Sequence, residues 1–415
     1  MSFPVRPLHT PVSLARDDIL VPGLPFMQYR PLFEELEHGE SPGNVTLQET
    51  DHHLLRSLLL NNTPLMDVRA PSEYVRGAFP CAENLPLLDD VERQRIGTCY
   101  KQEGQDAAIA LGHRLVQGPI KQARLERWQA WLQAHPGAWL YCFRGGLRSA
   151  IVQQWLAEAG TPCPRVPGGY KAMREFLMET IEQASHNRPL LVIAGATGCA
   201  KTHLLRQLPD GVDLEGHARH RGSAFGAMLG GQPSQIDFEN SLAIDLLHQE
   251  QRQGSGRLVL EDESHAIGSL SVPFVLYSAM KQAPIALIEE PLDVRADTIL
   301  NDYIRSNLAD FERVDPELAF SRFAQYLLGS LDRITRRLGG ERHVELRRLM
   351  EDALVVQERT GATQGHRDWI MRLLAEYYDP MYRHQLAKRL DRVIFRGNGS
   401  EFLAWAASTQ DSATA

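Results

Sequence analysis

Short apolar runs alternate along the chain with stretches in which apolar residues recur every three or four positions. The apolar runs, which are typical of buried strands, cover residues 64–69, 138–142, 190–194, 257–260 and 284–288. The stretches of helical period cover residues 54–60, 107–115, 123–133 and 149–159. Strands that alternate with helices form parallel sheets. The pattern therefore predicts an α/β fold with parallel sheets.

The same pattern divides the chain into five segments. They are an N-terminal extension over 1–53, a first α/β unit over 54–184, a second α/β unit over 188–292, a helical region over 293–402 and a tail over 403–415. The extension is rich in proline and weakly periodic, so we expect it to be loosely structured. The polar stretch Ser185-His-Asn-Arg is the expected boundary between the two α/β units.

Charge and cysteine usage exclude several classes of protein. The chain has 415 residues, and its 44 Lys and Arg against 52 Asp and Glu give a net charge of −8. An acidic chain does not coat nucleic acid through bulk charge, so DNA is not an expected partner. The sequence has no long apolar run and no secretion signal, so we expect a cytoplasmic protein without a membrane partner. The five cysteines lack the paired spacing of a zinc site, so a functional cysteine would be a thiol and no metal site is certain.

Cys142 lies at the end of a predicted strand, in Tyr141-Cys-Phe-Arg-Gly-Gly-Leu-Arg-Ser149. Two glycines let the backbone curl before a predicted helix, so backbone N–H groups can converge on an anion beside the sulfur. These amides and the neighbouring arginines would stabilise a Cys142 thiolate, the reactive form. The anion-binding candidates are Phe143, Arg144, Gly145, Gly146, Leu147 and Arg148. The alternative is a buried cysteine beside an ordinary loop.

Two motifs that precede this loop are Asp67-Val-Arg-Ala-Pro-Ser-Glu-Tyr and Gly77-Ala-Phe-Pro-Cys-Ala-Glu-Asn-Leu-Pro. Together with the loop they resemble a rhodanese domain, a family that carries sulfur on a loop cysteine. Five residues separate Cys142 from Arg148, which is the spacing of cysteine-dependent phosphatases and leaves room for a phosphate-sized group. The loop therefore permits either a chalcogen carrier or a phosphatase.

A second loop, Gly195-Ala-Thr-Gly-Cys-Ala-Lys-Thr202, follows a predicted strand and opens a helix, which is the context of a phosphate-binding loop. Lys201 would supply a point charge, and Thr202 could hold Mg²⁺. Ala200 stands where glycine normally precedes the lysine, and its methyl group could crowd a bound phosphate. The candidate contacts are Gly195, Gly198, Ala200, Lys201 and Thr202.

Two carboxylates end the strand that is predicted downstream of this loop. Glu261 or Asp262 could hold Mg²⁺ or orient Lys201. The alternative is that they are only a common acidic strand end.

Two further features have less specific interpretations. Cys99 could be a relay thiol, although a packed cysteine is the favoured interpretation. His217, Arg219 and Arg221 lie in a glycine-containing basic stretch that would either contact an anion near the phosphate loop or form a solvated turn.

The combination of the two loops is more specific than either loop alone. Further motifs are Gly97-Thr-Cys-Tyr-Lys-Gln, Val166-Pro-Gly-Gly-Tyr-Lys-Ala, Asp213-Leu-Glu-Gly-His-Ala-Arg-His-Arg-Gly-Ser-Ala-Phe-Gly, Leu260-Glu-Asp-Glu-Ser and Tyr377-Tyr-Asp-Pro-Met-Tyr. With them the chain closely resembles the tRNA 2-selenouridine synthases over residues 54–402. The resemblance implies a rhodanese-like domain followed by a P-loop domain. It also implies an enzyme that converts wobble 2-thiouridine of tRNA to 2-selenouridine through an S-geranyl intermediate.

The resemblance further implies substrates and roles. Cys142 would be the catalytic cysteine, and selenophosphate and geranyl diphosphate would be the substrates. We infer from the two loops that the Cys142 loop would bind selenophosphate and the Gly195 loop the diphosphate of geranyl diphosphate, with Mg²⁺ as an optional ion. A selenophosphate source and tRNA would be partners. The candidate tRNA contacts are Arg336, Arg337, Arg347 and Arg348, and nearby tyrosines at 377, 378 and 382 could stack on an unpaired base.

Two alternatives stay open at this point. One is a rhodanese-type sulfurtransferase or phosphatase fused to a P-loop kinase-like domain. The other is a catalytically idle adaptor that binds tRNA.

Overall fold

The computed structural model describes residues 49–411. The expected N-terminal extension lies outside the described residues except for 49–53, which belong to helix α1 (Glu49–Leu60). Leu55 and Leu59 are four residues apart, so they share one face of this helix, and both are buried. Helix α1 therefore begins before residue 54, the predicted start of the first α/β unit.

The first α/β unit contains a three-stranded parallel sheet. Its strands are β1 (Leu65–Asp67), β2 (Ala82–Asn84) and β3 (Trp139–Tyr141), in the order β2-β1-β3. Its helices are α2 (Pro71–Arg76), α3 (Asp90–Glu103), α4 (Gln105–Leu115), α5 (Gly118–Ala134), α6 (Leu147–Glu158) and α7 (Gly169–Asn187). Met66, Leu140, Trp128 and Val152 meet in its core. The predicted alternation of strands and helices is therefore confirmed in this unit.

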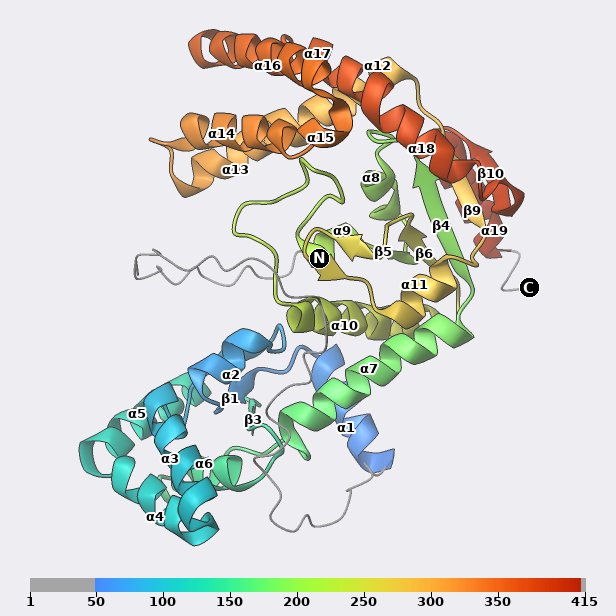
Figure 1. Ribbon diagram of the computed structural model, residues 1–415. Helices are drawn as coiled ribbons and strands as arrows, with labels where there is room; N and C mark the ends of the chain where they lie inside the picture. Colours follow the sequence, from blue (N-terminus) through green and yellow to red (C-terminus); the bar gives the residue numbers. More distant parts are fainter. Residues whose placement is uncertain (1–48, 412–415) are drawn as a thin grey trace. The chain divides into compact units, whose positions relative to one another are not determined.

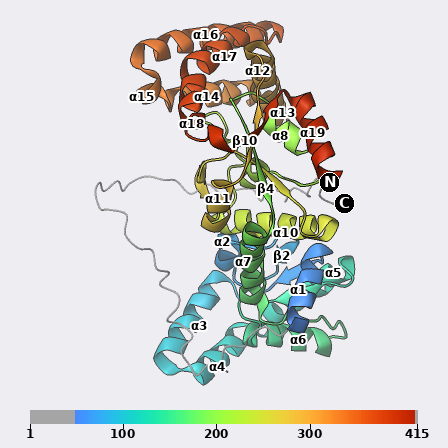
Figure 2. The same ribbon diagram turned by 90° about the vertical axis from the view of Figure 1, so that its right-hand side faces the viewer.

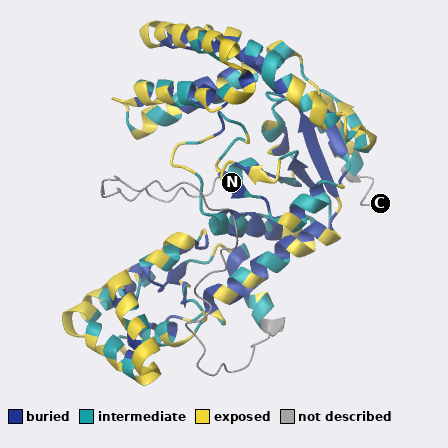
Figure 3. Cartoon of the chain, in the orientation of Figure 1, coloured by how far each residue is buried: buried dark blue, intermediate teal, exposed yellow. Residues whose placement is uncertain are grey.

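The second α/β unit contains a five-stranded parallel sheet in the order β10-β9-β4-β6-β5. Its strands are β4 (Leu190–Gly195), β5 (Gly211–Val212), β6 (Leu258–Glu261), β9 (Ile285–Ile288) and β10 (Val393–Gly397). Strands β4, β6 and β9 are buried throughout, as Figure 3 shows by their dark colour. Complete burial explains why their sequences read as continuous apolar runs.

Shorter elements and helices surround this sheet. They are α8 (Lys201–Leu205), α9 (Leu214–Ala218), α10 (Gln235–Gln253), the hairpin of β7 (Ala266–Ile267) and β8 (Leu270–Ser271), α11 (Phe274–Met280) and α19 (Gly399–Asp411).

Two predictions about the C-terminal part of the chain are wrong. Strand β10 interrupts the region that was expected to be helical, and it joins the sheet as an edge strand beside β9. Residues 403–411, which were expected to form a tail, belong to helix α19. Phe402 and Ala406 are fully buried on one face of α19, in a cluster that includes Leu204 and Ile288. Contacts with residues far away in the sequence therefore order this end of the chain.

The region between β9 and β10 is a helical layer with its own core. Its elements are α12 (Leu292–Ile299), the π-helical turn η2 (Leu300–Arg305), α13 (Ser306–Val314), α14 (Ala319–Asp332), α15 (Thr335–Leu338), α16 (Gly340–Thr360), α17 (His366–Leu373), the π-helical turn η3 (Leu374–Tyr378), α18 (Asp379–Leu386) and the 3₁₀ turn η4 (Leu390–Arg392). Phe323, Leu331, Met350 and Trp369 meet in this core. The predicted helical region is thus correct apart from β10.

Helix α7 is one continuous element that leads from the first α/β unit to β4. It packs against α10 and α11, and both views place α7 beside α10 (Figure 1 and Figure 2). Ser185, which was expected to lie at a polar boundary, is buried, and its hydroxyl donates to the Ile181 carbonyl within the helix. No helix within residues 49–411 is long and apolar enough to cross a membrane.

Candidate functional site

The loop between β4 and α8 has the strand, turn and helix context that the sequence predicted. Gly195 ends β4, and a Cβ atom there would lie 2.8 Å from the Ile288 carbonyl oxygen. Gly198 has a φ of +90°, and a Cβ atom there would lie 2.8 Å from the Arg295 carbonyl oxygen. Both positions therefore require glycine, and the loop backbone is held tightly between β9 and α12.

Ala200 departs from glycine at a position where glycine would be unstrained. Its φ of +54° and ψ of +29° are in the left-handed region, directly before α8. An L-residue with a Cβ atom pays about 1–2 kcal/mol in that conformation. The cost of alanine is thus backbone strain, in addition to the crowding that the sequence suggested.

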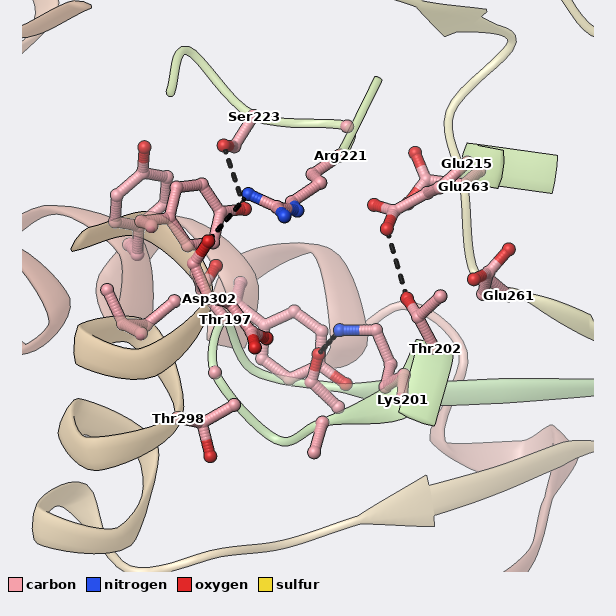
Figure 4. A pocket seen from close by; sticks show the side chains of 18 of the residues that line it. Thr197, Lys201, Thr202, Glu215, Arg221, Ser223, Glu261, Glu263, Thr298 and Asp302 are labelled. Atoms are coloured by element: carbon pink, nitrogen blue, oxygen red, sulfur yellow. Dashed lines mark hydrogen bonds between the residues drawn. The ribbon is translucent and has the colours of Figure 1, made fainter. Parts of the chain in front are cut away.

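Lys201 and Thr202 start α8, and Thr202 faces a group of carboxylates (Figure 4). The Lys201 ammonium donates to the Gly195 carbonyl oxygen at 2.9 Å, so it lies folded over its own loop. The Thr202 hydroxyl donates to Glu215 Oε2 at 3.0 Å. The first residues of α8 therefore place one cation and one hydroxyl beside the loop amides.

Three glutamates near these residues have perturbed ionisation. Burial and the neighbouring Glu215 raise the pKa of the Glu263 carboxyl to about 8. Burial also raises the pKa of Glu215, although Lys201 and Thr202 oppose this shift. Glu263 donates a hydrogen bond to Glu215, so the pair holds a proton at neutral pH. Burial and Asp213 raise the pKa of Glu261 well above its usual value.

Glu261 and Asp262, the two predicted carboxylates, both line the pocket, but they differ in their partners. Asp262 accepts hydrogen bonds of 2.5 and 2.7 Å from the Arg389 guanidinium, so its charge is already paired. Glu261 accepts from the Leu214 backbone N–H at 3.0 Å, and its Oε1 atom has no hydrogen-bond partner among the described residues. Glu215 and Glu263 flank Thr202 instead, and sequence reasoning missed both. Glu215 lies in the same stretch as His217, Arg219 and Arg221, and the cations there were the predicted contacts.

A pocket of about 670 Å³ opens above the phosphate loop. One side is polar and consists of the loop, Lys201, Thr202 and the glutamates. The other side comes from the helical layer, where apolar and aromatic residues stand beside polar ones such as Thr298, Asp302 and Arg337. Its members include Ile299, Tyr303, Ile334, Tyr377, Tyr378, Met381 and Tyr382. The tyrosines that were expected to stack on an RNA base therefore line this pocket.

The Cys142 loop connects β3 to α6 in the first α/β unit. Gly145 has a φ of +66°, and α6 begins at Leu147. A second loop supports it from behind, because the backbone N–H of Tyr170 donates to the Cys142 carbonyl oxygen at 2.9 Å. A Cβ atom on Gly169 would lie only 2.4 Å from that same oxygen. The Val166-Pro-Gly-Gly-Tyr motif thus allows the two backbones to approach closely.

The thiol of Cys142 is 3% exposed and lies 3.2 Å from the Ser149 hydroxyl. Arg148 does not stand alone beside it, because its guanidinium donates to Glu73 at 2.6 and 3.2 Å. Glu73 also pairs with Arg93 at 3.0 Å. The side chains of Arg93 and Arg148 both stay partly exposed. The sequence predicted the arginine but missed Glu73, which lies within the motif that begins at Asp67.

Comparison with known proteins identifies the family. A family model described as "tRNA 2-selenouridine synthase AAA domain" matches residues 188–413. A tRNA 2-selenouridine synthase of Shewanella loihica is 51% identical over 84% of this chain and 94% of its own length. Those of Bordetella petrii and Pseudomonas fluorescens are 53% and 52% identical, over 86% and 85% of this chain and 95% of each relative. The chain belongs to the tRNA 2-selenouridine synthase family.

The arginines that were predicted to contact tRNA lie on two helices of the helical layer. Arg336 and Arg337 lie on α15, and Arg348 lies on α16; all three are exposed. Arg337 also lines the pocket. Arg347 is paired with Asp332 at 2.8 Å and with Glu351 at 2.9 Å, so it is less available for a phosphate.

The basic stretch after β5 is only partly directed at the pocket. His217 is turned toward α10, where its ring nitrogens contact Ser241 at 2.8 Å and Asp245 at 3.2 Å. His217 therefore faces α10 and is not among the residues that line the pocket, whereas contact with an anion stays a prediction for Arg219 and Arg221. Arg219 is exposed at the end of α9, whereas Arg221 lines the pocket and donates to the Asp302 carbonyl oxygen at 2.8 Å (Figure 4).

Cys99 lies on α3 and is buried. All five cysteines are free thiols, so no disulfide is formed. Burial agrees with the interpretation of Cys99 as a packed residue, and a relay role stays a prediction.

Proposed function

We propose that this chain converts 2-thiouridine at the wobble position of tRNA to 2-selenouridine, in two steps at two sites. The first step attaches a geranyl group to the sulfur at the Lys201 pocket. The second replaces the geranylated sulfur with selenium from selenophosphate at the Cys142 loop. The names of the curated relatives support the overall reaction. The composition of the pocket supports the first step.

The observation that carries the proposal is that one pocket combines the phosphate loop with a group of apolar and aromatic residues from the helical layer. Geranyl diphosphate has a polyanionic head and a ten-carbon apolar tail. Loop amides and Lys201 match the head, while Ile299, Ile334 and Met381 match the tail. A pocket of about 670 Å³ is in the size range of small-molecule sites.

The oxygen donors beside the loop fit Mg²⁺, the ion that the sequence allowed. Within residues 49–411 no group of three or more His, Cys, Asp or Glu could hold a metal ion by itself. Thr202 and Glu215 would therefore hold Mg²⁺ together with diphosphate oxygens, and the unpartnered Oε1 of Glu261 adds a buried acceptor nearby. The ion would supply positive charge to the leaving diphosphate.

The proposed chemistry assigns each side a task. The thiouridine sulfur attacks C1 of the geranyl group, an S–C bond forms, and the C–O bond to the diphosphate breaks. Diphosphate leaves with the electron pair, and Lys201 and the loop amides stabilise its charge. Alkylated sulfur is then a good leaving group at C2 of the base. Selenium from selenophosphate forms a bond to C2, the C2–S bond breaks and geranylthiol leaves, and water cleaves the Se–P bond to release phosphate, with Cys142 as the catalytic thiol.

Two substitutions separate the steps. Cys142→Ser should abolish selenium incorporation and leave geranylated tRNA to accumulate, because geranylation does not need the thiol. Lys201→Ala should block geranylation, yet selenium should still enter tRNA that is supplied already geranylated. Mass spectrometry of tRNA nucleosides distinguishes the two products by mass.

Three results would contradict this assignment. They are wild-type selenouridine in the Cys142→Ser variant, undiminished geranylation in the Lys201→Ala variant, or equal loss of both steps in either variant. Release of phosphate from a generic phosphoester without tRNA would favour the phosphatase alternative instead.

A further inference from the structure

Tyr382 on α18 has a buried hydroxyl whose hydrogen-bonding capacity is unused. Its ring packs against Ala194, Ile285 and Leu287, at the end of β4 that leads into the phosphate loop. The hydroxyl oxygen is buried and has no hydrogen-bond partner within residues 49–411. A buried hydroxyl without a partner costs about 1–3 kcal/mol, so its placement calls for an explanation.

A buried guanidinium fixes α18 to the phosphate loop. Arg295 on α12 is 5% exposed and donates to both carboxylate oxygens of Asp379 at 2.7 Å. The same guanidinium donates to the Thr197 carbonyl oxygen at 3.2 Å, within the loop. Asp379 and Tyr382 are three residues apart on α18, so they share one face of the helix. The anchor that ties Asp379 to the loop therefore also places Tyr382 beside it.

The Tyr382 hydroxyl is a hydrogen-bond donor, and it has no acceptor partner within residues 49–411. Burial raises the pKa of Tyr382, and Asp262 and Cys199 raise it further, so the group stays protonated. Asp262 and Glu289 are the carboxylates near the hydroxyl. Asp262 accepts two hydrogen bonds from Arg389, and Glu289 pairs with Arg396 at 3.9 Å. Tyr382 and Gly195 both line the same pocket. An acceptor that completes this site would therefore come from a molecule bound in the pocket.

We propose that the Tyr382 hydroxyl donates a hydrogen bond to a diphosphate oxygen of the prenyl donor held by the Lys201 loop. Tyr382 is thus a substrate-binding residue that the helical layer contributes to a site built on the sheet. This proposal rests on the proposed function, because it takes the ligand of the pocket to be a diphosphate. In the Tyr377-Tyr-Asp-Pro-Met-Tyr motif, Asp379 would then anchor α18 to Arg295, and Tyr382 would bind the diphosphate.

Calorimetric titration of the full chain with inorganic diphosphate, and then with geranyl diphosphate, tests this role in the presence of Mg²⁺. Tyr382→Phe should raise both dissociation constants by about tenfold, since it removes one hydrogen bond to a charged oxygen. Tyr277→Phe removes a tyrosine hydroxyl from α11, which does not line the pocket, and should leave both constants unchanged. The ligand-free Tyr382→Phe variant should unfold at the same temperature as the wild type or higher, because it loses a hydroxyl that has no partner.

The outcomes separate this proposal from the one on which it rests. If the wild type binds diphosphate, Lys201→Ala loses that binding and Tyr382→Phe keeps it, the role of Tyr382 is wrong and the pocket assignment stands. An equal weakening by Tyr277→Phe would also overturn the role of Tyr382. If the wild type binds neither diphosphate, the proposed function itself is wrong.

Discussion

The shared proton of Glu215 and Glu263 makes a prediction about stability that can be worked out from the structure. Burial and Glu215 raise the pKa of Glu263 from 4.5 to about 8. Between these two values the folded chain keeps a proton that the unfolded chain has released. The free energy of unfolding therefore falls as the pH rises from 4.5 and levels off above about 8.

Glu263→Gln isolates this effect because glutamine can still donate to Glu215 but does not ionise. One pKa unit corresponds to about 1.4 kcal/mol, so the full shift would be worth about 5 kcal/mol. Residual solvent contact of Glu263 reduces this to about 3 kcal/mol. The variant should match the wild type near the acid end of the range and be more stable by about 3 kcal/mol above pH 8.

Thermal unfolding of the ligand-free protein, followed by circular dichroism at about pH 5 and about pH 8.5, measures this difference. The midpoint of the variant should exceed that of the wild type by about 4 °C at the higher pH, with little difference at the lower pH. An unchanged pH dependence, or a variant that is less stable at the higher pH, would show that Glu263 does not hold the proton.

The neighbouring residue provides a matched control. Asp262→Asn also neutralises a carboxylate, but it removes the partner of the half-buried Arg389. An unpaired, partly buried guanidinium should cost about 3 kcal/mol at both pH values. Adjacent substitutions of the same chemical kind should thus change stability in opposite directions.

Two further predictions concern the loop and the RNA. Ala200→Gly should stabilise the protein by about 0.5–1 kcal/mol in the same unfolding assay, since relief of left-handed strain exceeds the added entropy of glycine in the unfolded chain; a loss of stability would contradict the strain. Alanine at Arg336, Arg337 and Arg348 together should reduce the log–log salt dependence of tRNA binding by about 0.7–0.9 per lost phosphate contact, whereas Arg347→Ala should add little; an unchanged slope would place the tRNA elsewhere.

Features that depend on neighbouring residues could be predicted from the sequence. Buried strands such as β4 and β9 appear as continuous apolar runs, so the α/β fold and its parallel sheets were predicted correctly. Glycine spacing and the residues that follow each strand predicted where the two anion-binding loops lie. The motifs around these loops also identified the family, which the comparisons confirm.

Features that depend on distant residues could not be predicted in this way. Strand β10 has only five residues and pairs with β9 more than a hundred positions earlier, so no local signal marks it. His217 lies in a basic stretch of the sequence, but contacts with Ser241 and Asp245 on α10 fix the position of its ring. Asp262 looks like a free carboxylate in the sequence, until Arg389 from beyond α18 pairs with it.

The sequence by itself determined which backbone segments curl between a strand and a helix, because glycine and helix-start signals act over a few residues. Only the tertiary structure decided what surrounds them. The fold places the helical layer over the phosphate loop, which turns a set of tyrosines into a pocket wall. It also places the half-buried Glu215 and Glu263 side by side, and desolvation raises the pKa of both carboxyls.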